Sequence, residues 1–171
     1  MFSNDLKILF HTIRIDKKIN SFRSFIVLLC YRLQHYCYLK KHRFLLSLVG
    51  GGKNLLFFLF RLDAQIFYEA QIGHHIRMPH SAMGVVISSK AIVGNNITIF
   101  HQVTLGVNES KPSDEQLIII HDNCYLSVGC KIISCELSEG CKIAPNTCVN
   151  KNLPANTICY TINETREQRK K

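Results

Sequence analysis

The sequence lacks several features that would assign it to a class at once. None of its eight cysteines follow the C-x-x-C spacing that is typical of a zinc site. The opening residues MFSNDLKILFH contain no basic segment followed by an apolar core and a small-residue cleavage site, so we expect no secretory signal peptide. The first absence argues against a zinc site, and the second predicts a cytoplasmic protein whose cysteines stay reduced.

Long apolar runs and acidic residues are also scarce near the N-terminus. FIVLLC (25–30), FLLSLV (44–49) and LLFFLF (55–60) each fall short of the roughly 18 residues that a membrane-spanning helix needs. Residues 1–63 carry eleven Lys and Arg against three Asp and Glu, a balance of +8, whereas residues 64–171 carry ten against nine, a balance of +1. A basic, apolar region of this kind predicts peripheral contact with the inner face of a membrane rather than nucleic-acid binding. Helices that pack on each other and on the following domain are the alternative.

Apolar spacing predicts that residues 1–64 form a basic, amphipathic helical region. The first helix is indicated by apolar residues at i, i+3, i+4 and i+7, namely Leu6, Leu9, Phe10 and Ile13. A second helix is expected from about Ser21 to His42. The triplet Gly50-Gly51-Gly52 is expected to break the helical stretch that follows, with a further helix over 53–62.

A six-residue repeat dominates the rest of the chain. From Ile87 it reads ISSKAI, VGNNIT, IFHQVT, LGVNES, and after a gap it resumes as IHDNCY, LSVGCK, IISCE, LSEGCK and IAPNTC. This period fits neither an α-helix nor a simple two-sided strand, and it is typical of a parallel β-helix. We therefore expect a mainly β domain over residues 65–160, with about four coils of three hexapeptides each and a polar, basic tail at 161–171.

Two interruptions of the repeat mark positions where functional groups could lie. Three extra residues separate the hexapeptides that begin at Met78 and Ile87, and about nine extra residues form a loop near 107–119. Loops on a rigid scaffold are common places for binding groups. The loop is therefore our candidate for a flap on the acceptor side of a site.

The register of the repeat also sorts the cysteines and histidines. Cys124, Cys130 and Cys141 occupy the fifth place of their hexapeptides, which we interpret as a small, inward-facing position. His80 and His101 each hold the third place, on the same face of consecutive coils. Since stacked coils lie about 4.8 Å apart, the two imidazoles should be neighbours.

The stretch MPHSAMGVVISSKAIVGNNITIFHQVTLG, together with NKNLPANT near the end, resembles the serine acetyltransferase branch of the hexapeptide-repeat acyltransferases. The resemblance covers roughly residues 64–160. It implies a left-handed β-helix, a homotrimer, and transfer of an acetyl group from acetyl-CoA to a hydroxyl, with no metal. His80 matches the catalytic histidine, whose neutral imidazole would accept the hydroxyl proton as a general base. His101 is a second catalytic candidate.

The resemblance also implies contacts to the donor acetyl-CoA, which would lie in a groove between subunits. The matching positions are Gly106, Val128, Pro145, Asn150 and Lys151. The ammonium group of Lys151 could bind a phosphate of the nucleotide.

Four departures from the family pattern concern the acceptor and the orientation of His80. Pro79 replaces an aspartate that precedes the histidine, and Leu117 falls where the family has a loop histidine. Gln65 replaces the carboxylate that orients the imidazole, although Asp63 and Glu69 lie nearby. In its short helical region and its Pro-His pair, the chain resembles family members that are encoded together with surface-polysaccharide genes. Serine and a sugar hydroxyl both remain possible acceptors.

Two other classes of protein remain open. A zinc enzyme similar to the gamma-type carbonic anhydrases would use His80, His101 and a third histidine, for which His121 is the candidate, as ligands, two from one subunit and one from its neighbour. A non-catalytic trimeric scaffold would fit the degraded repeats, because ISSKAI, IHDNCY and LSEGCK lack the usual glycine in second place.

Overall fold

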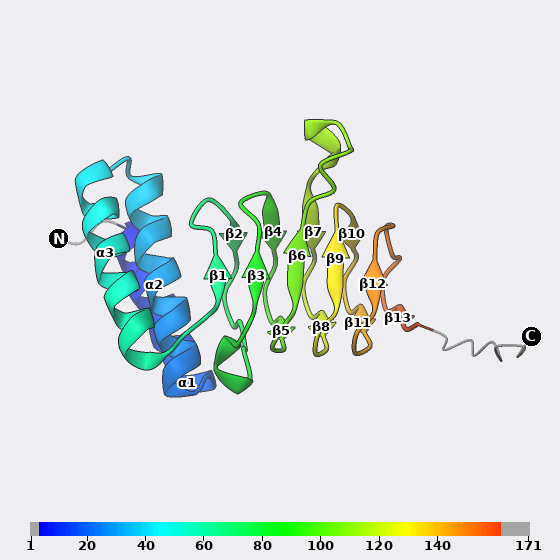
Figure 1. Cartoon of the computed structure of the whole chain (residues 1–171), viewed down its shortest axis with the longest axis horizontal. Coiled ribbons are helices and arrows are strands. Elements are labelled where there is room, and N and C mark those ends of the chain that lie inside the picture. The colour runs from blue at the N-terminus through cyan, green and yellow to red at the C-terminus, as the bar shows by residue number, and fades with distance from the viewer. Residues whose placement is uncertain (1–3, 162–171) are drawn as a thin grey trace, which may run out of the picture.

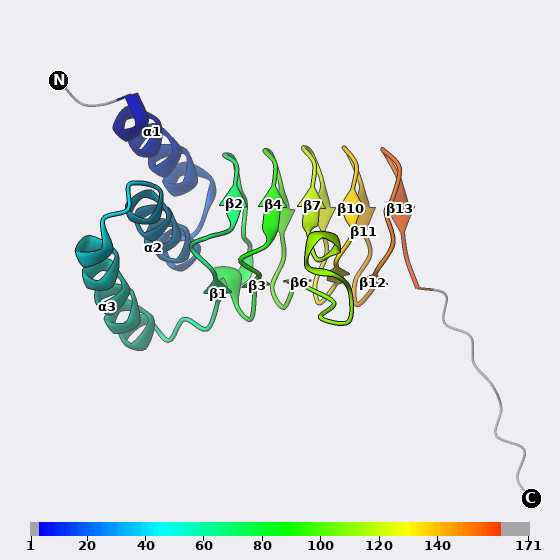
Figure 2. The same cartoon turned by 90° about the horizontal axis from the view of Figure 1, so that it is seen from above.

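The computed structural model describes residues 4–161, in which three α-helices are followed by thirteen short strands (Figure 1). The helices are α1 (Asn4–Ile19), α2 (Phe22–Leu39) and α3 (Arg43–Phe60). They lie together at one end of the strands, as the view from above also shows (Figure 2). The tail expected at 161–171 lies outside the described residues except for its first residue.

The expectation for α3 was wrong in one respect, because the helix continues through the glycine triplet. Gly50 lies against Gln34 of α2, whereas Gly51 and Gly52 face open space. Each glycine costs a helix about 1 kcal/mol relative to alanine. The inner face of α3, which includes Leu46 and Phe57, packs on α2 and offsets that cost.

This continuity also corrects the expectation about membrane spans. The two apolar runs join into one helix of 18 residues, which by length and composition is sufficient to cross a membrane. Across Arg43–Phe60, all of it described, no residue is buried. Phe44 and Phe58 are about 81% and 80% exposed, respectively. The outer face of α3 is therefore apolar and uncovered in a single chain.

The strands form three parallel sheets that wind as a β-helix. The first sheet, here the β1 sheet, contains β1 (Gln65–Ile66), β3 (Val86–Ile87), β6 (Thr104–Gly106), β9 (Lys131–Ile133) and β12 (Cys148–Val149). The β2 sheet contains β2 (Gln71–Ile72), β4 (Ala91–Val93), β7 (Ile118–Ile120) and β10 (Glu136–Leu137). The β5 sheet contains β5 (Thr98–Ile99), β8 (Tyr125–Leu126), β11 (Lys142–Ile143) and β13 (Ile158–Cys159).

The observed pairing confirms the register predicted from the hexapeptides. Ile87 pairs with Leu105, Leu105 with Ile132 and Ile132 with Val149, each one coil further along the stack. The other two sheets follow the predicted columns in the same way. Further pairings add turns at both ends, through Ile66 at the start and Cys159 at the end.

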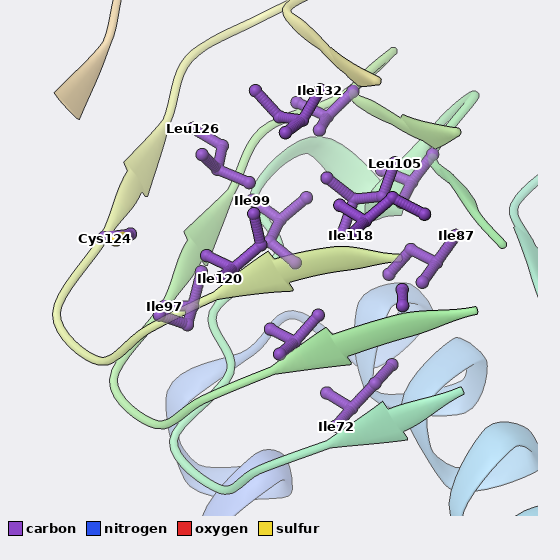
Figure 3. Close-up of a cluster of buried hydrophobic side chains, with 14 of the residues drawn as sticks. Ile72, Ile87, Ile97, Ile99, Leu105, Ile118, Ile120, Cys124, Leu126 and Ile132 are labelled. Carbon is purple, nitrogen blue, oxygen red and sulfur yellow. The ribbon is translucent and has the colours of Figure 1, made fainter. Parts of the chain in front are cut away.

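The core is the column of inward side chains between the three sheets. Figure 3 shows these side chains meeting in the interior, and its labelled residues include Ile72, Ile87, Ile99, Leu105, Leu126 and Ile132. Burying each such side chain contributes roughly 1.5–3 kcal/mol. Cys124, Cys130 and Cys141 are buried in the same column, as their register predicted. Burial raises the pKa of the Cys124 thiol to about 11 and that of Cys130 to about 12.

Side chains of the helices bind the backbone edge of the first coil. Carbonyl oxygens of this coil accept hydrogen bonds from Asn20, which lies between α1 and α2, and from three side chains of α2: Ser24, Tyr31 and Arg32. His35 of α2 bonds to the carbonyl of Tyr68 in the tautomer that carries its proton on Nδ1. Arg32 also pairs with the buried carboxylate of Asp16 at 3.0 Å. Burial raises the pKa of Asp16, and the nearby guanidinium opposes that shift. These bonds satisfy polar groups that would otherwise form an open sheet edge.

Candidate active site

The three-residue insertion after Met78 forms a turn whose backbone is strained. His80, Ser81 and Ala82 all have positive φ, at 54°, 62° and 54°. Non-glycine residues rarely adopt this region, which costs of the order of 1–3 kcal/mol per residue. Such strain persists only where the surroundings impose it, and it is common at functional sites. The turn is therefore a candidate site on geometric grounds alone.

The structure brings His80 and His101 together, as the register predicted. Their ring centroids lie 4.8 Å apart with an interplanar angle of 75°. His80 is exposed, whereas His101 is half-buried, and its Nδ1 atom is buried without a hydrogen-bond partner within residues 4–161. Phe100 lies beside His80, with ring centroids 6.0 Å apart. The pair thus presents one accessible imidazole against a more enclosed one.

Val128 and Pro145, two of the predicted contacts to acetyl-CoA, continue the column of residues that begins at this histidine pair. The backbone N–H of Gly129 donates to the carbonyl of His101, and the N–H of Asn146 donates to the carbonyl of Val128. His101, Val128 and Pro145 therefore stack coil on coil where the β5 sheet turns into the β1 sheet. We call this edge, with His80 at its head, the histidine corner.

The other predicted contacts to acetyl-CoA lie at the opposite edge of the β1 sheet. Gly106 pairs with Ile133 at the far end of the sheet, where the chain turns toward the β2 sheet. Asn150 and Lys151 follow β12 at the same edge and are exposed. Thr104 and Lys131, paired on the outer face of the sheet, lie between the two edges. One face of the β-helix thus carries both groups of predicted residues.

The long loop expected near 107–119 spans 107–117 in the structure, since β7 begins at Ile118, and it leaves from this second edge, not from the histidine corner. Figure 1 shows it rising beside β7, on the side opposite the β5 sheet. The ammonium group of Lys90 donates to Ser113 Oγ at 2.7 Å and to Gln116 Oε1 at 3.0 Å. Leu117, where the family has a histidine, is exposed in this loop. Within one chain, therefore, the loop does not lie over His80.

The family's carboxylate that orients the imidazole has no direct counterpart here, and of Gln65, Asp63 and Glu69 it is Asp63 that contacts the strained turn. Its Oδ1 atom accepts a hydrogen bond from the backbone N–H of Gly84 at 3.0 Å. Gln65 is exposed on the outer face of β1, where it pairs with Val86. Glu69 lies between β1 and β2, at the edge where the β1 sheet turns into the β2 sheet. Its Oε2 atom is buried and has no hydrogen-bond partner in the described part of the chain.

The third histidine of the zinc hypothesis lies elsewhere. His121 follows β7, and its Nε2 atom lies 2.7 Å from Glu136 Oε1. Within residues 4–161 no group of three His, Cys, Asp or Glu side chains is placed to hold a metal ion. A single chain therefore does not bring the three proposed ligands together.

Sequence reasoning missed two residues that contact the segment leading into His80. Asn20 and Ser24 bond to the backbone of Met78, which lies 54 or more positions further along the chain. Ser24 is fully buried. The S-x-x-S spacing of Ser21 and Ser24 marks a helix start, since Ser21 Oγ accepts from the N–H of Ser24, but it gives no sign of the distant contact.

No protein-family model matches the chain. Over 133 residues it is 33% identical to the serine acetyltransferase of Buchnera aphidicola subsp. Schizaphis graminum, covering 77% of this chain and 49% of that protein. Soybean serine acetyltransferase complexed with serine matches with a TM-score of 0.66 at 26% identity, over 80% of this chain and 54% of that one. A serine acetyltransferase in complex with CoA shares the fold, with a TM-score of 0.63 at 24% identity, over 79% of this chain and 52% of that one.

The three parallel sheets, the six-residue register and these solved structures define the chain as a left-handed β-helix of the hexapeptide-repeat acyltransferase class. Within that class, its sequence and fold are similar to those of the serine acetyltransferases, as its sequence motifs predicted. The chain spans about half the length of the relatives that it matches.

Proposed function

We propose that this chain is an acetyl-CoA-dependent O-acetyltransferase with His80 as its general base. The observation that supports this most directly is the pair of imidazoles at a strained, exposed turn, at the head of the histidine corner. The similarity to serine acetyltransferases, among them structures with serine and with CoA, supports the same reaction.

In the proposed reaction, a neutral imidazole of His80 accepts the proton of the acceptor hydroxyl as its oxygen attacks the thioester carbonyl carbon. The carbon–sulfur bond then breaks, and the leaving thiolate takes the proton from the imidazolium. The products are the acetyl ester and free CoA thiol, and His80 returns to its neutral form. His101 packs against His80 and is the second candidate catalytic group.

The donor would lie along the face that carries both groups of predicted contacts. Val128 and Pro145 line one edge of that face, and Gly106, Asn150 and Lys151 line the other. The exposed ammonium group of Lys151 is free to approach a phosphate, and charge-assisted bonds of this kind are strong. In a homotrimer the groove would lie between subunits, and the loop at 107–117 of a neighbour could then serve as the flap.

Two substitutions in the acceptor region favour a sugar hydroxyl over serine. Pro79 offers no charge to an amino group, and the exposed Leu117 offers no hydrogen bond. A site built to bind serine would lose much of its discrimination without such partners. Serine remains the second candidate acceptor.

The helical region supports a position at the cytoplasmic face of a membrane. α3 exposes an apolar face, and Lys40, Lys41 and Arg43 surround its start. Basic residues near an apolar helix favour anionic lipids. Flotation with anionic vesicles, but not with zwitterionic ones, is the expected result, and flotation with neither would contradict this placement.

The test of the function is release of CoA thiol from acetyl-CoA, measured with serine and with a panel of sugars. His80→Ala should lower turnover by about 10²–10⁴-fold, the usual contribution of a general base. His121→Ala is the matched control, because that histidine lies away from the histidine corner and should be dispensable. Full activity of the His80 variant would exclude His80 as the base. A protein that binds no CoA at millimolar concentration would fit the non-catalytic scaffold, and stoichiometric zinc in the purified protein would favour the metal enzyme.

A further inference from the structure

The segment that carries His80 is held by residues of the helical region as well as by its own coil. Met78, two residues before His80, is almost fully buried. Its carbonyl oxygen accepts a hydrogen bond from Ser24 Oγ at 2.6 Å, and its N–H donates to Asn20 Oδ1 at 2.7 Å. Asn20 Nδ2 also donates to the carbonyl of Ile76 at 2.9 Å. Both backbone groups of Met78 are thus fixed from the start of α2.

A second attachment fixes the other side of the turn. Asp63, just after α3, accepts the N–H of Gly84 through Oδ1 at 3.0 Å. Between these attachments the Met83 N–H donates to the His80 carbonyl within the turn, and the N–H of Gln102, in the next coil, donates to the Met83 carbonyl. Ala82 is fully buried within it.

Strain explains why these attachments matter. Three consecutive residues with positive φ would relax toward ordinary backbone conformations if the flanking segments were free. The turn carries His80 on its first strained residue, so relaxation would move the imidazole away from His101. A displacement of about 1 Å at a reacting group can lower a rate by as much as about 100-fold.

We propose that Asn20, Ser24 and Asp63 are positioning residues that clamp the His80 turn and make the helical region part of the catalytic apparatus. The proposal rests on His80 acting as the base in the function proposed above. It assigns Asp63 the role of a hydrogen-bond acceptor for the backbone N–H of Gly84, not that of an ionic partner of the imidazole.

Ser24→Ala and Tyr31→Phe form a matched pair of variants. Each removes one buried hydroxyl that donates from α2 to a carbonyl of the first coil, at Met78 and at Ala70, respectively. Their effects on stability should be similar, because each variant leaves one buried carbonyl unsatisfied. Only the Ser24 bond lies beside the His80 turn. We expect Ser24→Ala to lower kcat about tenfold with KM for acetyl-CoA unchanged, and Tyr31→Phe to leave both constants near wild type.

Asp63 offers a second pair on an exposed side chain, where folding is not at risk. Asp63→Asn keeps an acceptor oxygen and should retain kcat, whereas Asp63→Ala should lower it severalfold. Equal losses in both variants would show that the charge matters rather than the bond, and would overturn the role assigned to Asp63.

Hydrogen exchange separates this proposal from the proposed function. In Ser24→Ala the amides of Met83 and Gly84 should exchange faster than in wild type, and in Tyr31→Phe they should not. If wild type transfers no acetyl group, the proposed function fails, and the exchange result still decides whether the turn is clamped. Indistinguishable exchange in the two variants would overturn the clamp.

Discussion

The repeat region and the helical region are stabilised in different ways. In the repeat region, backbone groups of one coil bind those of the next, and each sixth residue enters a shared core. In the helical region, long-range side-chain bonds attach α2 to the first coil, and α3 leaves its apolar face uncovered. Regular local rules therefore build the scaffold, whereas a few individual side chains set how the helices meet it.

The largest effect is expected at the buried pair in the helical region. Arg32→Ala should destabilise the protein by about 3–5 kcal/mol in urea unfolding, because it leaves the Asp16 carboxylate buried and unpaired. Burial already raises the pKa of Asp16, so the loss should shrink as the pH falls and the carboxyl protonates. Arg43→Ala, at an exposed position, should stay within about 0.5 kcal/mol. Equal losses in both variants would contradict the role of the buried pair.

Two leucines compare the interior of the β-helix with the face of α3. Leu105 is fully buried, whereas Leu48 is 62% exposed. Leu105→Ala should cost about 2–5 kcal/mol, and Leu48→Ala should cost less than about 0.5 kcal/mol, both measured by chemical denaturation. A large loss at Leu48 would show that its face is covered in solution.

Alkaline pH should weaken the repeat region through its buried thiols. Burial raises the pKa of Cys130 from 9.0 to about 12. Since the unfolded chain releases this proton at lower pH, stability should fall as the pH rises above 9. Thermal unfolding between pH 8 and 10.5 measures this slope, and Cys130→Ala should flatten it. An unchanged slope in that variant would exclude Cys130 as a contributor.

Two glycines give the smallest and most direct comparison. A Cβ added at Gly51 of α3 meets nothing within 4 Å, so Gly51→Ala should stabilise the protein by about 0.5–1 kcal/mol. A Cβ at Gly73 in the first coil would lie 2.5 Å from the Gly94 carbonyl oxygen, so Gly73→Ala should destabilise it. Melting temperatures that shift in the same direction would contradict this difference.

The contrast between the regions also explains what could be predicted from the sequence. The period of six places Ile87, Leu105 and Ile132 in one column and brings His80 next to His101, since each coil repeats the previous one. No such rule extends across the glycine triplet, where packing on α2 outweighs the local preference of glycine for a break. Nor does any local pattern connect Ser24 with Met78, because that contact depends on how α2 meets the first coil.

The polar side chains along α2 have a consequence for self-association. A stack of parallel strands ends in an open row of backbone groups, which is a template for another chain. Here five side chains occupy the carbonyls of the first coil and leave no room for an added strand on that side. The helices therefore act as a terminator for the stack, and removing residues 1–62 should convert a finite particle into one that polymerises end to end.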